Sequence, residues 1–123
     1  MKQQSKTRTL AAKKSQSQFV CNLSALTPDE REQHRQNGHK IFHAVQDVKE
    51  LPNGYAFQLP ADSSLLVTVA LFIEKERLCC PFFHFVVEVD EENGPMWVHV
   101  TGREGVKPFI RNEFELDELI EKR

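Results

Sequence analysis

The sequence predicts an α+β fold: an antiparallel sheet of about five strands with three helices. Three observations support this prediction. Some stretches alternate apolar and polar residues, others repeat apolar residues every three or four positions, and capping or turn residues separate them. The expected order is β-α-β-β-α-β-β-α. The first six elements match a ferredoxin-like βαββαβ core, and a C-terminal strand and helix extend it.

A short strand is expected at residues 19–23, and a helix is expected from Thr27 to about Val45. Thr27 precedes a proline, and Glu30 lies three residues after it, a combination that is typical of a capped helix start. Apolar residues recur along one face of this helix. We therefore expect that face to pack against the sheet.

A β-hairpin is expected next, with strands at residues 48–51 and 55–59. Asn53 and Gly54 lie between them and favour the positive φ angles of a type I′ turn. A second helix is expected from Ser63 to about Leu78, and its apolar residues cover a wide arc. Pro81 would end this helix, which is predicted to be the most buried element.

The next two strands are expected at residues 82–90 and 96–101, because apolar residues alternate in both. A five-residue turn at 91–95 joins them into a second hairpin. Thr101 and Glu104 are candidate caps for a last helix that continues to Ile120. An alternative arrangement stays open, in which a helix precedes two ββα units at residues 48–78 and 82–121. Both arrangements are α+β with an antiparallel sheet.

Charge divides the chain into a tail and a body. Residues 1–18 contain five basic residues and no acidic one, which leaves 11 basic and 18 acidic residues, or −7, in residues 19–123. The tail has few large apolar side chains, so it is predicted to be disordered, and residues 19–123 are predicted to form a single domain. The acidic body argues against nucleic-acid binding, except weakly through the basic tail.

No apolar run approaches the roughly 18 residues that cross a bilayer, so no membrane association is expected. The apolar stretch at residues 10–12 is too short for a secretory signal and runs into two lysines. The expected location is therefore the cytoplasm. The sequence predicts neither a particular partner nor an oligomeric state.

The three cysteines are the main candidates for chemistry. Cys21 lies in the first expected strand, and Cys79 and Cys80 follow the second helix. In a ferredoxin-like sheet the first and fourth strands are neighbours, so the three sulfur atoms are expected at one end of the sheet. The odd count and the expected cytoplasmic location argue against a structural disulfide framework.

Three thiolates around one point suit a soft cation such as Cu(I), Zn(II) or a heavier thiophilic ion. Glu76, one turn before Cys80, is a candidate fourth ligand or proton acceptor. The predicted function is therefore the binding of a soft metal or metalloid through Cys21, Cys79, Cys80 and Glu76, with a thiophilic ion as cofactor. No catalytic residue is predicted, and the sequence leaves open whether the protein is an enzyme.

Two other hypotheses stay open. The cysteines can be core residues of an interaction module that binds a partner or small ligand through His84, Trp97 and His99 on the outer sheet face. They can also form a redox sensor in which an oxidant joins Cys79 or Cys80 to Cys21. A free nucleophilic cysteine is disfavoured, because the partial negative charge at a helix C-terminus opposes a thiolate.

The run Glu-Arg-Leu-Cys-Cys-Pro-Phe-Phe at residues 76–83 follows a Cys-x-Leu at residues 21–23 and a hairpin at Gly54. Over about residues 19–110 the chain resembles small uncharacterised bacterial proteins that carry a Glu-x-x-Cys-Cys-Pro-Phe centre and are associated with heavy-metal resistance settings. The resemblance implies that Cys21, Glu76, Cys79 and Cys80 belong to one site.

Overall fold

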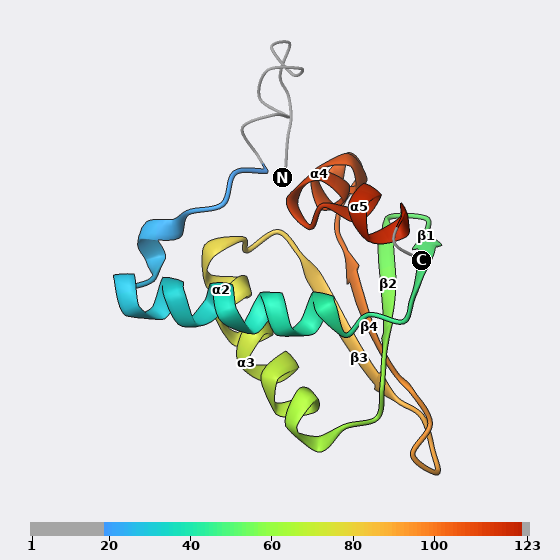
Figure 1. Ribbon diagram of the computed structural model, residues 1–123. Coiled ribbons are helices and arrows are strands. Elements are labelled where there is room, and N and C mark those ends of the chain that lie inside the picture. Colours follow the sequence, from blue (N-terminus) through green and yellow to red (C-terminus); the bar gives the residue numbers. More distant parts are fainter. Residues whose placement is uncertain (1–18, 122–123) are drawn as a thin grey trace.

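The computed structural model describes residues 19–121 and shows an α+β fold (Figure 1). The predicted tail, residues 1–18, lies outside the described residues. The elements are a 3₁₀ turn, four helices and four strands. In chain order they are η1 (Leu23–Ala25), α2 (Pro28–His43), β1 (Asp47–Leu51), β2 (Gly54–Leu59), α3 (Ser63–Cys79), β3 (His84–Val89), β4 (Met96–Thr101), α4 (Val106–Glu113) and α5 (Leu116–Glu121).

The sheet is antiparallel throughout, as predicted, but its described residues form four strands in the order β1-β2-β4-β3. In a ferredoxin-like core the first strand of the chain would lie between the strands seen here as β2 and β3. That position is taken by β4. A short turn joins β4 to β3, so this pairing closes a much smaller loop than a pairing with residues 19–23 would.

The strand expected at residues 19–23 is therefore wrong. Local hydrogen bonds turn this segment away from the sheet, because the Asn22 side chain accepts from the Ser24 backbone N–H at 3.1 Å. The Asn22 backbone N–H donates to the carbonyl of Cys79 at 2.7 Å. The segment is consequently attached to the end of α3, and the element order is that of the alternative with two ββα units.

The first hairpin forms where it was predicted, but its turn differs. Neither Asn53 nor Gly54 has a positive φ, so the expected type I′ turn is wrong. Gly54 is already part of β2, and a Cβ atom there would collide with the backbone carbonyl of Val100 on β4. Close strand packing therefore requires this glycine. The left-handed turn residues are Glu92 and Asn93, in the second hairpin.

Helix α2 begins as predicted, with Thr27 and Glu30 forming a reciprocal capping box. The last helix differs from the prediction, because it is divided into α4 and α5 at Glu115, whose φ is 51°. Its start is also later than expected. Thr101 stays in β4, paired with both neighbouring strands, and Gly105 occupies the N-cap position.

The core lies on one face of the sheet, where the aromatic rings of several elements meet. Phe57 of β2 contacts Phe42 of α2 at 5.4 Å and Phe114 after α4 at 6.4 Å between ring centroids. Helix α2 and the α4–α5 region therefore cover the same face, and Figure 1 shows α2 and α3 side by side. Among residues 19–121, no helix is both long and apolar enough to cross a membrane.

Candidate metal and thiol site

The vicinal cysteines lie at the C-terminal end of α3. Cys79 is its last residue, and the N–H of Cys80 closes the final turn by donating to the Glu76 carbonyl at 2.7 Å. Pro81 follows and prevents the helix from continuing. Both cysteines are only 1% exposed. The helix end therefore presents two sulfur atoms to the interior.

Cys21 and Cys80 are joined by a disulfide, with their Cα atoms 4.6 Å apart. This is one of the two pairings that the redox-sensor alternative named, although the odd number of cysteines argued against a structural disulfide framework. The hydrogen bond from Asn22 to the Cys79 carbonyl attaches the 3₁₀ segment to the end of α3 and brings the two residues together. The sulfur atoms were expected to meet through strand pairing, but a helix end and a turn bring them together instead.

Two groups of side chains have the spacing of metal ligands. Cys21, Cys80 and Glu113 form one group, and His34, Glu76 and Cys79 form the other. Within each group the candidate ligand atoms all lie within 4.8 Å of one another. All four residues predicted for the site belong to these groups. The sulfur and nitrogen donors suit a soft or borderline cation, whereas the carboxylates alone would suit a harder one.

Glu76 and His34 form a buried pair between α3 and α2. The His34 Nε2 atom lies 2.6 Å from Glu76 Oε1, and Glu76 is 3% exposed. The imidazole stacks on Phe72 with a centroid distance of 4.5 Å. The other ring nitrogen, Nδ1, is buried and has no hydrogen-bond partner among the described residues. A buried polar atom without a partner is uncommon and is a candidate contact for a ligand.

Burial raises the pKa of the Cys79 thiol to about 11, and the negative charge of Glu76 adds to this effect. Glu113 contributes less to the same shift. The thiol therefore stays protonated near neutral pH, which disfavours a free nucleophile. A bound cation would reverse the balance, because its positive charge stabilises the thiolate.

Glu113 lies where the two groups meet. The residue is exposed, but its carboxyl group faces the pocket and loses water there, which raises its pKa; the nearby Glu76 acts in the same direction. A carboxyl group with a raised pKa can hold or release a proton at a less acidic pH than an ordinary glutamate. The site thus combines three sulfur atoms with two acidic groups and one imidazole.

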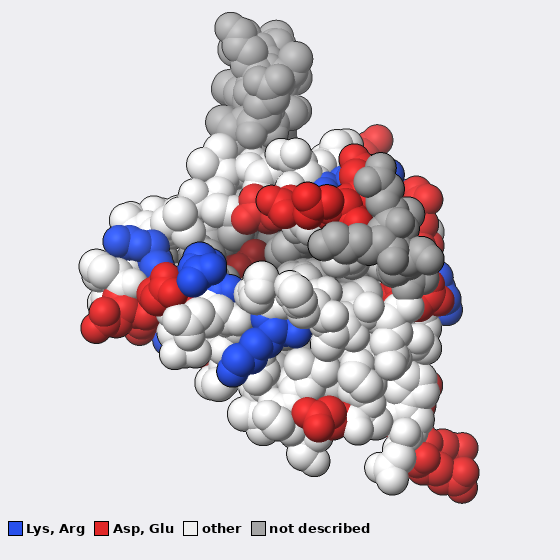
Figure 2. Space-filling view, in the orientation of Figure 1, with Lys and Arg blue, Asp and Glu red and all other residues white. Residues whose placement is uncertain are grey.

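All six residues line one pocket of about 760 Å³. Its opening lies between α2 and the α4–α5 region, and Figure 2 shows basic side chains over α2 facing acidic side chains over α4 and α5. Much of the wall is apolar. The apolar side chains that line it are Leu23, Phe42, Val45, Phe72, Phe114 and Leu119.

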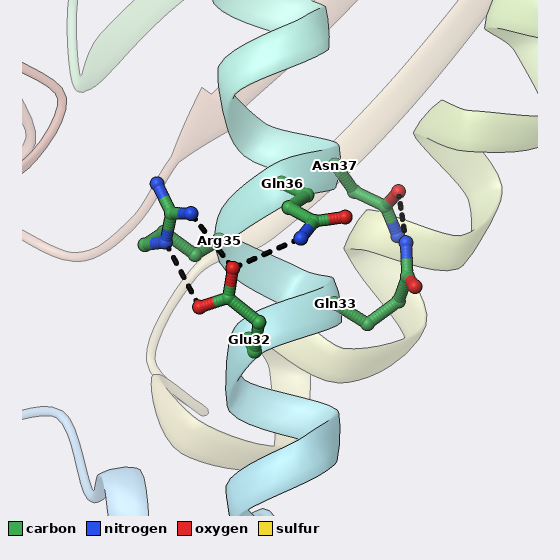
Figure 3. A network of polar contacts seen from close by, with 5 residues as sticks. All are labelled: Glu32, Gln33, Arg35, Gln36 and Asn37. Atoms are coloured by element: carbon green, nitrogen blue, oxygen red, sulfur yellow. Dashed lines mark hydrogen bonds and ion pairs between the residues drawn. The ribbon is translucent and has the colours of Figure 1, made fainter.

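Arg35 is a cationic residue of this lining and is held by its neighbours on α2 (Figure 3). Its guanidinium donates to both carboxylate oxygens of Glu32, at 2.7 and 3.2 Å. Hydrogen bonds from Arg35 and Gln36 lower the pKa of Glu32 to about 2. Arg35 is therefore neutralised by Glu32, and the net charge of the pocket comes from its glutamates.

Sequence reasoning missed His34 and Glu113. A signal for His34 was present, because it lies three and seven residues before Asn37 and Ile41, the two residues of α2 that are buried. It therefore lies on the inward face of the helix. Glu113 carried no comparable signal, since its position depends on the break between α4 and α5.

The outer sheet face shows a different arrangement. Trp97 lies beneath the Lys49 ammonium group, with Nζ 4.6 Å from the ring centroid. His99 is 3.5 Å from Glu88, and His84 is exposed. None of these five residues lines the pocket described above. Glu88 and His99 lie on paired strands, as is common on a sheet face, whereas Lys49 reaches Trp97 across the intervening strand β2.

The chain was compared with protein-family models, with curated proteins and with solved structures, and none of the three comparisons gives a match.

Proposed function

We propose that this protein, in its reduced form, captures a soft metal or metalloid ion through Cys21, Cys79 and Cys80. One observation carries the proposal: all three cysteines, with Glu76 and His34, line the same pocket, where Cys21 and Cys80 belong to one group of candidate ligands and Cys79 belongs to the other. Thiolate and imidazole donors in this number select thiophilic ions over oxygen-seeking ones. The ion is the cargo or cofactor of the site, and no reaction on it is proposed.

Capture requires reduction first. A dithiol reductant transfers two electrons and two protons to the Cys21–Cys80 disulfide, which yields two thiols and an oxidised reductant. A divalent ion then replaces three thiol protons and forms a tris-thiolate. The Cys79 proton has an acceptor close by in the Glu76–His34 pair, whose atoms lie within 4.8 Å of the sulfur. The other two protons leave past Glu113 to solvent.

The proposed compartment is the cytoplasm, where glutathione and thioredoxin keep thiols reduced. A heavy-metal resistance setting, which the Glu-x-x-Cys-Cys-Pro-Phe resemblance implies, fits the same proposal. In such a setting the protein would hold a toxic ion in a pocket with little contact to water.

The experiment is a titration of the anaerobically reduced full chain with Zn(II), Hg(II) and arsenite. Free thiols are counted and bound ion is measured by native mass spectrometry. We expect one bound ion per chain, and up to three thiols that no longer react because the ion occupies them. For an ion that binds all three sulfurs, Cys79→Ser and Cys80→Ser should each weaken binding at least tenfold. The control is Glu115→Gln, which changes a carboxylate of the same lining that belongs to neither ligand group. Unchanged thiol reactivity with every ion would refute the proposal.

A second candidate function is redox sensing, which the Cys21–Cys80 disulfide favours. In that case oxidation and reduction of this bond would be the signal. The reduced protein would then bind soft ions no more tightly than a small dithiol compound does. A redox titration followed by mass spectrometry, repeated with and without the best ion, separates the two functions. If the ion is the biological ligand, it should protect the reduced form from peroxide.

A further inference from the structure

The pocket is much larger than the ion that its sulfur atoms would hold. Its volume is about 760 Å³, which lies in the range of roughly 300 to 1,000 Å³ found for pockets that bind small organic molecules. A single water occupies about 30 Å³ in the liquid, and an ion between thiolates needs space of the same order. Most of the pocket therefore remains for something other than the ion.

The side chains of the pocket wall indicate which kind of chemical group fills the remaining space. Three aromatic rings line the pocket, and Phe42 contacts both Phe72 and Phe114, with centroid distances of 6.2 and 5.1 Å. Leu23 adds an aliphatic side chain that is 57% exposed. A bare ion gains nothing from such surface, whereas an aryl or alkyl group gains about 25 cal/mol for each Å² that it buries.

We propose that the ligand is an organic derivative of the soft ion, such as a trivalent arsenical with one aryl group, whose arsenic binds the Cys21 and Cys80 sulfurs while the ring packs on the aromatic wall. This inference rests on the proposed function and names its substrate class. The two sulfurs are adjacent, since they form a disulfide when oxidised, and reduction leaves them placed for one arsenic atom.

The binding step balances without any change of oxidation state. An arylarsenic oxide reacts with the two thiols to form two As–S bonds, and the oxide oxygen leaves as water with both thiol protons. Arsenic stays trivalent, its third bond being the one to carbon. This ligand uses two of the three cysteines of the proposed site, because Cys79 belongs to the other group of side chains, with His34 and Glu76. The Glu113 carboxylate lies within 4.8 Å of the Cys21 and Cys80 sulfurs, close enough to pass on their two protons.

The test compares phenylarsine oxide with arsenite on the reduced full chain. The two probes differ in their intrinsic affinity for sulfur, so their dissociation constants are not compared directly. The informative quantity is the factor by which a substitution in the apolar pocket wall changes the affinity for each probe. Leu23→Ala should weaken phenylarsine oxide about fivefold and change arsenite less than twofold. Phe114→Ala should weaken phenylarsine oxide at least tenfold. Val20→Ala is the matched control, since Val20 is a nearby apolar residue that is 64% exposed and does not line the pocket.

Each outcome has a defined meaning. Equal effects of the wall variants on both probes, or no effect on either, would overturn this inference and leave the proposed function standing. Failure of the wild-type chain to bind phenylarsine oxide would overturn this inference, whereas the proposed function falls only if Zn(II), Hg(II) and arsenite all leave the thiol reactivity unchanged. Phe114 also contacts Phe57, so its variant is checked by circular dichroism, and Leu23→Ala decides the matter if Phe114→Ala does not fold.

Discussion

His34 Nε2 lies 2.6 Å from Glu76 Oε1, and this contact joins α2 to α3 directly beside the Cys79 sulfur. Both side chains are largely buried. If one of them is removed, water cannot take its place as hydrogen-bond partner of the other. The pair therefore has two roles. It fixes the position of the two helices that form the pocket, and it supplies a proton acceptor next to a protonated thiol.

The first prediction concerns the strength of this pair. His34→Ala and Glu76→Ala should each lower the free energy of unfolding by about 3 kcal/mol, because each leaves a buried polar group without its partner. The double variant should cost about 1 to 3 kcal/mol less than the sum of the two. Urea denaturation of the four proteins measures this coupling.

The control for this cycle is another pair between the same helices. Lys75 and Glu30 are 3.3 Å apart but much more exposed than His34 and Glu76. Their coupling should be clearly weaker than that of His34 and Glu76, because solvent screens surface ion pairs. Equal coupling in the two cycles would mean that burial does not strengthen the His34–Glu76 contact.

The second prediction concerns the disulfide. It links residues 59 positions apart, so in the chain-entropy view its reduction should lower the free energy of unfolding by about 4 kcal/mol. Denaturation with and without dithiothreitol measures the difference. Cys21→Ser should be as stable as the reduced wild type and insensitive to the reductant. Cys79→Ser should be destabilised by dithiothreitol as much as the wild type is. If the reductant has no effect on this variant, the cysteines are paired differently.

The sequence predicted the elements well where local signals decide them. The capping box of Thr27, both hairpins and the end of α3 before Pro81 all follow from neighbouring residues. The arrangement of the strands was less predictable. Residues 19–23 have a β-like composition, but a hydrogen bond to the distant Cys79 carbonyl decides their conformation.

The same distinction applies to the site. The sequence pointed to Cys21, Glu76, Cys79 and Cys80, because sulfur chemistry is visible in residue type alone. It gave a bond between Cys21 and Cys79 or Cys80 only as one alternative, since the wrong strand assignment gave Cys21 the wrong route to the helix end. Glu113 reaches the pocket only because α4 stops before Glu115, and nothing in the local sequence indicates that break.

The third prediction concerns Gly54. Gly54→Ala should lower the free energy of unfolding by about 2 to 3 kcal/mol, because the added methyl group would collide with the Val100 carbonyl on the neighbouring strand β4. Gly94→Ala is the comparison. Its nearest contact is the Asp90 side chain at 2.8 Å in an exposed turn that can shift, so the loss should be smaller. Similar losses in both variants would contradict this account of the hairpin.

The fourth prediction is a dependence of stability on pH that comes from Cys79. Its pKa is raised from an ordinary value of 9.0 to about 11, so the unfolded chain releases the thiol proton at a lower pH than the folded chain does. The stabilisation is therefore complete below pH 9 and is lost as the pH rises through 11, the pKa of the folded state. The loss amounts to about 3 kcal/mol.

The measurement compares wild type with Cys79→Ser at pH 8 and pH 11, with the disulfide intact so that Cys79 is the only free thiol. All other ionisable groups are the same in both proteins, so their contributions cancel in the difference. The wild type should lose about 2 kcal/mol more than the variant over this interval, because at pH 11 the folded thiol is about half ionised. If the two proteins lose stability in parallel, burial and Glu76 do not hold the Cys79 thiol protonated. Metal binding would then not need the Glu76–His34 pair to accept the proton of Cys79.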